Sequence, residues 1–358
     1  MEHGLRVGVI GCGYWGEKHL RVLTGVSEVT QVVAIDSNPH NLRKVAREYP
    51  SVLSRSSVEA ALDDIDAVIV ATPPESHAEL ALVAIEANKH VFVEKPMTVS
   101  TAEADIVVEA AARAGVTLAV GHTFVHNAAV HKLVDLAQSG SLGKLHHINA
   151  ARLNLGLYRE DVNVIWDLAA HDISITMAIM GRAPDEVAAW GLRHTTSFAE
   201  DVASVRLIYR DENVDSIIRV SWLDPMKVRQ TTVVGSKKMA VYDDMATDER
   251  IKILDRGREH GSEDRMTSHL AYRYGDIYTP FIDFPEPLRA QAEDFVRSCL
   301  DEGRSPRATG MDGRDVVAVL EASDESTLHN GQPVPVAQPQ LVGHGAHARG
   351  PVLSGTSL

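Results

Sequence analysis

Three side chains have the chemical types needed to move a proton and steady a negative charge: Lys95, Asp167 and His171. Lys95 stands between Glu94 and Pro96, just past an apolar run that is typical of a buried parallel strand. Because proline disfavours a helical backbone at the residue before it, we expect Lys95 to be extended at the tip of that strand. Its ammonium group would then project into a cleft. The alternative is a Lys–Glu pair on a surface turn, which contributes little.

Asp167 and His171 lie four residues apart, so on a helix they share one face. The carboxylate could then orient the imidazole and leave its other nitrogen free to accept a proton. Spacing alone does not separate this role from a simpler one, in which Asp167 caps the helix and His171 is a buried structural histidine. Asp172 points about 100° away round the same helix and is the weaker candidate.

A glycine pattern near the start of the chain predicts a dinucleotide partner for these groups. An apolar stretch, residues 7–10, runs into Gly11-x-Gly13-x-x-Gly16, and a helix-like segment follows at 17–24. In such a site the first glycine permits a tight turn, the second lets the backbone approach a pyrophosphate, and the third lets the helix pack on the strand. The N–H groups at the helix start then face the anion.

Asp36 follows the second apolar strand, 29–35, at about the spacing after Gly11 (~20 residues) expected of a carboxylate that binds the adenine ribose. A lone glycine pattern is a weak signal, but a strand on each side favours nucleotide binding over an ordinary turn. The carboxylate would repel the 2′-phosphate of NADP, and residues 37–39 bring no cation. We therefore expect NAD rather than NADP as the cofactor.

The bulk composition excludes several classes of protein. With 358 residues the chain should form about two domains. A net charge of −14 argues against a nucleic-acid partner, and no apolar run is long enough to span a membrane. Two cysteines, Cys12 and Cys299, make no disulfide framework, and the first strand leaves no room for a signal peptide, so we expect a cytoplasmic protein. No Cys/His cluster has zinc spacing, and we expect no metal.

Alternating strand and helix signals predict a doubly wound parallel sheet, a Rossmann domain, over residues 1–122. The expected strands are 5–10, 29–35, 66–71, 90–93 and 117–121, and the expected helices are 17–24, 38–48, 57–62, 76–87 and 101–114. Ligands of such sheets bind beyond the carboxyl ends of the strands. Those ends carry the glycine pattern, Asp36, Thr72 and Pro73, Glu94 and Lys95, and His122.

After residue 122 the pattern changes to strands of alternating polarity. They predict an α/β domain over residues 123–337 with a large, mainly antiparallel open sheet. The expected helices of this domain are 127–139, 167–180, 287–301 and 311–330, the last two closing it. Residues 255–285 are expected to form a long loop, and residues 338–358 a flexible C-terminal extension that adds no core.

Taken in order, Gly11-x-Gly13-x-x-Gly16, Ala71-Thr72-Pro73 with His77, Glu94-Lys95-Pro96 and Asp167-x-x-x-His171 resemble the glucose-fructose oxidoreductase / inositol dehydrogenase / MocA (Gfo/Idh/MocA) family. The resemblance covers about residues 5–336. It implies a Rossmann domain, then an α/β domain whose open sheet builds homodimers or homotetramers, with Lys95, Asp167 and His171 as the catalytic residues. The implied cofactor site comprises Gly11, Gly13, Tyr14, Trp15, Gly16, Asp36, Ser37, Thr72, Pro73, His77, Glu94 and Lys95.

Segments 152–156, 163–168, 274–277 and 286–289 resemble the nucleotide-sugar branch of that family, whose members oxidise or reduce a hexose ring carbon, typically C3, towards amino or deoxy sugars. In this branch Arg152 and Asn154 would bind diphosphate or sugar hydroxyls; otherwise they are plain strand residues facing solvent. The implied substrate contacts are His122, Phe124, Arg152, Asn154, Trp166, Asp167 and His171. His126 and Ala128 depart from the family pattern, which leaves the sugar open.

These observations predict an NAD-dependent oxidoreductase that moves a hydride between nicotinamide and a ring secondary alcohol or ketone of a sugar, in first place a nucleotide-activated hexose. His171 suits the base that takes the hydroxyl proton, and Lys95 the cation that steadies the alkoxide or, with a lowered pKa, shuttles the proton. One alternative is a cyclitol or free-aldose dehydrogenase. Another, of a different class, is a non-catalytic NAD-binding regulator, against which the retention of all three catalytic residues speaks.

Overall fold

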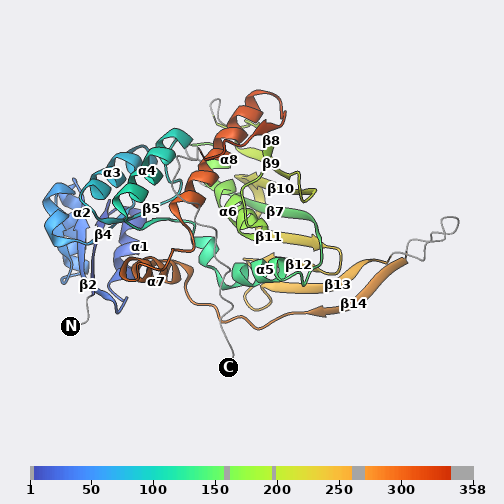
Figure 1. Cartoon of the computed structure of the whole chain (residues 1–358), viewed down its shortest axis with the longest axis horizontal. Helices are drawn as coiled ribbons and strands as arrows, with labels where there is room; N and C mark the ends of the chain where they lie inside the picture. The colour runs from blue at the N-terminus through green and yellow to red at the C-terminus, as the bar shows by residue number, and fades with distance from the viewer. Residues whose placement is uncertain (1–3, 157–161, 196–198, 260–270, 340–358) are drawn as a thin grey trace.

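A six-stranded parallel sheet forms the N-terminal half of the protein, in the order β3-β2-β1-β4-β5-β6. The computed structural model describes residues 4–156, 162–195, 199–259 and 271–339 (Figure 1). The strands are β1 (Leu5–Ile10), β2 (Val29–Ile35), β3 (Leu53–Arg55), β4 (Ala67–Val70), β5 (His90–Val93) and β6 (Leu118–Val120). Doubly wound sheets that bind dinucleotides have this strand order, so the expected doubly wound parallel sheet is confirmed.

Helices cover both faces of this sheet, which explains the unbroken apolar strands. Ile69 of β4 lies in one core, while its neighbours Val68 and Val70 lie in the core on the opposite face. The covering helices are α1 (Tyr14–Leu23), α2 (Pro39–Glu48), α3 (His77–Glu86) and α4 (Thr101–Ala114). The short strand β3 was not predicted, and the helix expected at 57–62 is a 3₁₀ turn, η1 (Glu59–Asp64).

A second sheet has nine strands in the described part of the chain, in the order β14-β13-β12-β11-β7-β10-β9-β8-β15. Its neighbours pair antiparallel except β7 and β10, which are parallel, so the expected mainly antiparallel sheet is confirmed. The strands are β7 (Leu145–Leu155), β8 (Glu186–Leu192), β9 (Val202–Tyr209), β10 (Val214–Ser221), β11 (Leu223–Gly235), β12 (Met239–Asp243), β13 (Ile251–Glu259), β14 (Ala271–Tyr278) and β15 (Val334–Pro335).

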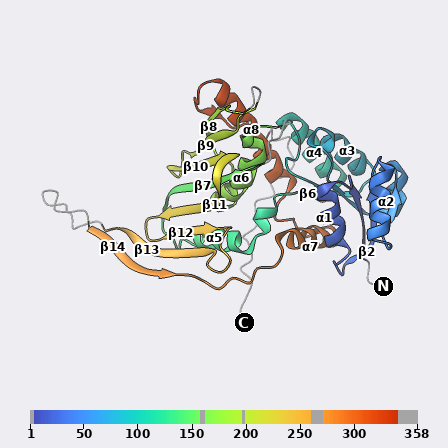
Figure 2. The same ribbon diagram turned by 180° about the vertical axis from the view of Figure 1, so that it is seen from behind.

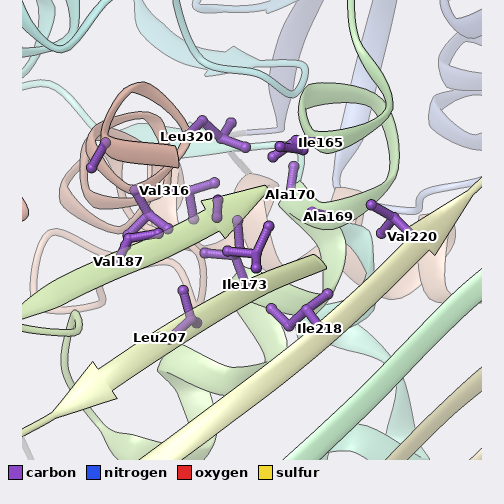
Figure 3. Close-up of a cluster of buried hydrophobic side chains, with 14 of the residues drawn as sticks. Ile165, Ala169, Ala170, Ile173, Val187, Leu207, Ile218, Val220, Val316 and Leu320 are labelled. Atoms are coloured by element: carbon purple, nitrogen blue, oxygen red, sulfur yellow. The ribbon is translucent and has the colours of Figure 1, made fainter. Parts of the chain in front are cut away.

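Helix α6 (Ala170–Met180) packs between this sheet and α8 (Gly310–Leu328). Figure 3 shows Ile173 of α6 beside Leu207 and Ile218 of the sheet, with Leu320 of α8 nearby; all four are fully buried. A third helix, α5 (Ala128–Gln138), packs against α6. This core fixes the start of α6, where His171 lies.

Helix α7 (Pro287–Leu300) corrects one expectation, because it packs on the first sheet rather than closing the second domain. Leu288, Phe295 and Val296 share a core with Leu5 and Val7 of β1. The amphipathic pattern of α7 predicted its helical structure, but an apolar stripe does not specify which apolar surface it will cover.

The loop expected over 255–285 was also wrong in large part. Strands β13 and β14 form a hairpin that projects from the edge of the second sheet, away from the N-terminal half (Figures 1 and 2). Charged residues interrupt these strands and hide their alternation. Residues 260–270 and the predicted tail from 340 onward lie outside the described residues.

No helix in the described ranges is long and apolar enough to cross a membrane.

Candidate active site

The glycine turn after β1 has the geometry that a pyrophosphate requires. Gly11 has a φ of +88°, and a Cβ on Gly16 would lie 1.8 Å from the Gly11 carbonyl oxygen. A Cβ on Gly13 would meet no atom within 4 Å, so the space above this residue is open to a ligand. Gly13 precedes α1 with no side-chain cap, which leaves N–H groups of the first helical turn for an anion. The residues present therefore fit a dinucleotide.

Asp36, at the end of β2, lies beside this turn. Its carboxylate accepts hydrogen bonds from the Cys12 amide (2.8 Å), the Asn38 amide (2.7 Å) and Asn41 Nδ2 (2.9 Å). Three donors and a partly exposed position hold a fixed negative charge where a ribose would lie. Ser37 is exposed.

Tyr14 and Trp15 open helix α1 with exposed side chains. Their rings contact each other edge-on at 5.6 Å, and Lys18 Nζ lies 4.6 Å from the Tyr14 ring centroid. The backbone of these two residues belongs to the turn that faces the expected anion, while their rings form an exposed aromatic pair beside it.

His77 joins the two strand-end loops that follow β4 and β5. Its Nε2 lies 2.9 Å from the Thr72 carbonyl oxygen, and its Nδ1 lies 2.9 Å from the Pro96 carbonyl oxygen. Both ring nitrogens of this buried histidine are engaged by the main chain. His77 therefore connects the loop of Thr72 and Pro73 to the loop of Lys95.

Glu94 is buried and pairs with a residue that the sequence did not single out. Its carboxylate lies 2.7 Å from His19 Nε2 and accepts a hydrogen bond from the Lys95 amide at 3.1 Å. Burial raises the pKa of Glu94, but these hydrogen bonds and the charges of His19 and Lys95 outweigh it and leave the pKa below its ordinary value. The Glu94 carboxylate thus holds the backbone of Lys95 in place through the Lys95 amide.

Lys95 reaches from the first sheet to the second half of the protein. Its Nζ donates to the Asp167 carbonyl oxygen at 2.9 Å and lies 3.7 Å from Asp167 Oδ1. Only 14% of the Lys95 side chain is exposed. The predicted projection of Lys95 into the space between the two halves is therefore observed.

Asp167 lies in a π-helical turn, η4 (Ile165–Ala169), rather than at the start of a helix. Asn163 caps this turn, since its Oδ1 accepts from the amides of Ile165 and Trp166. The Asp167 carboxylate accepts from Trp222 Nε1 at 3.1 Å. The alternative that Asp167 caps the helix is therefore wrong. Such π-helical turns occur often at functional sites.

His171 lies at the beginning of α6 with its ring edge-on to Phe124 at 5.1 Å. Its Nδ1 is buried and has no hydrogen-bond partner among the described residues, so the expected bond from Asp167 is not formed there. Burial lowers the pKa of His171 well below its ordinary value, and the charges of Lys95, Arg152 and Arg229 lower it further. The imidazole is therefore neutral at pH 7, as a base requires.

Arg152 is not the solvent-facing strand residue of the alternative interpretation. Its Nε and Nη2 donate to the two carboxylate oxygens of Asp172 at 2.7 and 3.2 Å, and its guanidinium lies 4.4 Å from the Phe124 ring centroid. Only 4% of its side chain is exposed. Asp172, the weaker candidate of the sequence analysis, has Arg152 as its partner. Asn154, nearer the end of β7, is partly exposed.

Trp166 and His122, two further residues implied as substrate contacts, have surroundings in the protein that the sequence did not predict. The indole of Trp166 donates to Asp324 Oδ2 at 2.7 Å, so this group points towards α8. Burial raises the pKa of Asp324. His122 is buried, neither ring nitrogen has a hydrogen-bond partner among the described residues, and burial lowers its pKa to about 4. His122 is a neutral side chain beneath the site.

Sequence reasoning missed His19, Asn163, Asp172 as a partner, and Trp222. Each makes a contact with a residue far along the chain, and of the four only Asn163 lies in a segment that the sequence analysis singled out, 163–168. Only the S/T/N/D preference of helix caps would have pointed to Asn163.

Two family models match the chain. The model of the Gfo/Idh/MocA oxidoreductase family with an NAD-binding Rossmann fold covers residues 5–122, and the Gfo/Idh/MocA C-terminal domain model covers residues 130–241. The solved UDP-N-acetylglucosamine 3-dehydrogenase GnnA from Acidithiobacillus ferrooxidans superposes with a TM-score of 0.78 and 25% identity, over 92% of this chain and 99% of that one.

Curated relatives include enzymes with different substrates. The UDP-N-acetylglucosamine 3-dehydrogenase of A. ferrooxidans is 33% identical over 55% of this chain, and the match spans 61% of that enzyme. The myo-inositol 2-dehydrogenase of Thermotoga maritima is 24% identical over 90% of this chain and 96% of that enzyme. A dTDP-3,4-didehydro-2,6-dideoxy-alpha-D-glucose 3-reductase of Saccharopolyspora spinosa is 34% identical over 42% of this chain and 46% of that enzyme.

The position of Asp36 generates a prediction about cofactor choice. We expect the protein to bind NAD more tightly than NADP, and Asp36→Asn to reduce that preference at least about tenfold, because the variant loses the charge that repels a 2′-phosphate. Calorimetric titration with both dinucleotides measures the two affinities. Asp63→Asn, at an exposed carboxylate of the same half, should leave the preference unchanged. Tighter binding of NADP by the unaltered protein would contradict this interpretation of Asp36.

Proposed function

Because the chain belongs to the Gfo/Idh/MocA oxidoreductase family, we propose that it is an NAD-dependent dehydrogenase or ketoreductase of a sugar. The reaction transfers a hydride between nicotinamide and a ring secondary alcohol or its ketone. The observation that carries the proposal is the contact of Lys95 Nζ with Asp167, across the space between the two sheets, one turn before His171. An ammonium, a carboxylate and a neutral imidazole together meet the needs of alcohol oxidation.

Bound NAD supplies the hydride acceptor, and the side chains of this chain manage the proton. As oxidation begins, the substrate hydroxyl loses its proton while negative charge develops on oxygen. His171, held neutral by burial and nearby cations, accepts the proton. Lys95 stabilises the developing alkoxide with its ammonium group, whose direction is set by the Asp167 carbonyl. Trp222 and Lys95 together orient the Asp167 side chain.

A nucleotide-activated hexose, oxidised or reduced at C3, is the substrate that we propose first. Two relatives act on nucleotide sugars at this carbon according to their names, a UDP-N-acetylglucosamine 3-dehydrogenase and a dTDP-sugar 3-reductase. A cyclitol is the second candidate, since the myo-inositol 2-dehydrogenase aligns along 96% of its own length.

We also propose that the uncovered face of the nine-stranded sheet joins copies of the chain into a homodimer or homotetramer. Residues that pair across neighbouring strands lie on the same face of a sheet. Ile217 pairs with Asn149 of β7, and Trp190 is linked to Ala151 of β7 through the paired residues Ser204 and Arg219. Trp190 and Ile217 therefore lie on the face opposite Arg152 and α6. Their side chains are large, apolar and exposed, Trp190 to 53% and Ile217 to 37%. Exposed apolar residues on a sheet face favour an interface.

Light scattering after size exclusion tests this assembly. The unaltered chain should elute as a dimer or tetramer, and Trp190→Glu should shift it towards the monomer, because a buried unpaired charge opposes association. Ile106→Glu, at a residue of α4 that is 54% exposed, is the matched control and should not change the mass. A monomeric unaltered protein at micromolar concentration would exclude the interface.

A spectrophotometric screen for NADH tests the reaction itself. Nucleotide sugars, cyclitols and free aldoses serve as substrates, and we expect the highest kcat/KM for a nucleotide sugar. Lys95→Ala should lower kcat about a hundredfold or more, the range of general acid–base and charge stabilisation, with little change in NAD affinity. Lys252→Ala, at an exposed lysine, is the control. Preference for a cyclitol selects the second candidate, while NAD binding without any turnover supports a regulator.

The lowered pKa of His171 predicts the acidic side of the pH profile. The neutral imidazole is the active form, so protonation abolishes the base. Since its folded pKa lies below 6.5, kcat/KM for oxidation should stay level from pH 7 to 6.5 and fall only at lower pH. In His171→Gln this acidic decline should vanish together with most of the activity. A decline that begins above pH 7 in the unaltered enzyme would contradict the role of His171.

A further inference from the structure

A cavity of about 320 Å³ lies next to the catalytic side chains. It is lined by Thr123, Phe124, Asn127, Asp244, Arg250, Phe284 and Pro287. Phe124 forms part of this wall and also contacts the His171 ring, so the cavity and the candidate active site share one residue. The volume is at the lower end of the range for ligand pockets, which suits one part of a ligand whose remainder lies at the catalytic residues.

Arginines gather on this side of the second sheet. Arg229 of β11 pairs in register with Arg152 of β7, so the two side chains leave the same face of the sheet. Arg250 lies on the cavity wall with its guanidinium 4.0 Å from the Phe284 ring centroid. Asp244 connects Arg229 and Arg250, at 3.3 and 3.6 Å from them.

These arginines differ in their exposure and in how many of their N–H groups donate hydrogen bonds within the protein. The Asp172 carboxylate engages Arg152 in a bidentate pair, and only 4% of that side chain is exposed. Arg229 donates one hydrogen bond, to Asp244 Oδ2, and Arg250 donates one, to the Asp244 carbonyl oxygen, within the described part of the chain. Each guanidinium carries five N–H donors, so most donors of Arg229 and Arg250 remain for a ligand. Their side chains are 35% and 23% exposed.

The local charge favours an anion although the whole chain is acidic. Arg152, Arg229 and Arg250 face two carboxylates, Asp172 and Asp244. The chain as a whole has a net charge of −14. The Asp244 carboxylate also accepts from the Tyr242 hydroxyl at 2.8 Å, which holds it at the back of the cluster. Planar guanidinium groups with unused donors bind phosphate oxygens in bidentate geometry.

We propose that Arg250, on the wall of this cavity, and Arg229, which pairs with Asp244 of the same wall, bind the diphosphate of a nucleotide-activated sugar, while the hexose lies against Lys95 and His171. This inference rests on the proposed function and names the part of the protein that separates a nucleotide sugar from a free sugar or cyclitol. It moves the expected diphosphate contact from Arg152, which is buried and held in a bidentate pair by Asp172, to the more exposed Arg229 and Arg250.

Steady-state kinetics with Arg250→Gln and Arg229→Gln test the assignment. Each variant should raise KM for the nucleotide sugar about ten- to a hundredfold, the range for one lost charge-assisted hydrogen bond, and change kcat much less. Arg250→Lys, which keeps the charge without the planar fork, should give an intermediate KM. Lys252→Gln, at an exposed cation of β13 two residues further along the chain from Arg250, is the matched control. Unchanged NAD affinity in every variant shows that the protein is folded.

Direct binding separates failure of this inference from failure of the proposed function. Uridine or thymidine 5′-diphosphate, titrated into the NAD-loaded protein, should bind, and Arg250→Gln should weaken that binding by the same factor as KM. If nucleotide sugars are turned over but neither KM nor diphosphate affinity responds to Arg229 and Arg250, the inference is overturned and the function stands. If the diphosphate binds through Arg250 but no sugar is turned over, the site stands and the function fails. Equal binding of a hexose 1-phosphate would overturn the assignment to a nucleotide diphosphate.

Discussion

One hydrogen bond, from Lys95 Nζ to the main-chain carbonyl of Asp167, connects the two halves of the site. Its donor lies beyond a strand of the parallel sheet, and its acceptor lies in the π-helical turn before α6. Glu94 and His77 fix the backbone on the first side, and Asn163 and Trp222 fix the second. The contact between Lys95 and Asp167 therefore depends on two separate loops, each held by its own hydrogen bonds, rather than on one local motif.

Burial and charge act together at this meeting point. The site collects Lys95, Arg152 and Arg229 in a chain whose net charge is strongly negative. In a partly desolvated pocket these cations oppose protonation of His171, which keeps the imidazole a base. A positive field of this kind would suit both the alkoxide of the proposed reaction and the anionic group of the proposed substrate.

Much of the first half was predictable from local patterns. Buried parallel strands are unbroken apolar runs in the sequence, so β1 and β2 were predicted closely. The positive φ of Gly11 strains any other residue type, so the dinucleotide turn was predicted as well. The predicted candidates Lys95 and Asp167 are in contact, but the predicted hydrogen bond between Asp167 and His171 does not form among the residues that the structure describes. The hairpin of β13 and β14 escaped prediction because its charged residues obscure a period of two.

The sequence alone determined most strands and helices of the first sheet, the cofactor turn, the carboxylate of Asp36 and the residue types available for proton transfer, because each depends on neighbours within a few positions. Only the tertiary structure decided that α7 covers the first sheet, that Asp172 holds Arg152 in a bidentate pair, and that Arg250 lines a cavity beside Phe124. Those outcomes depend on which surfaces and charges meet across long stretches of chain, and spacing along the sequence carries no record of that.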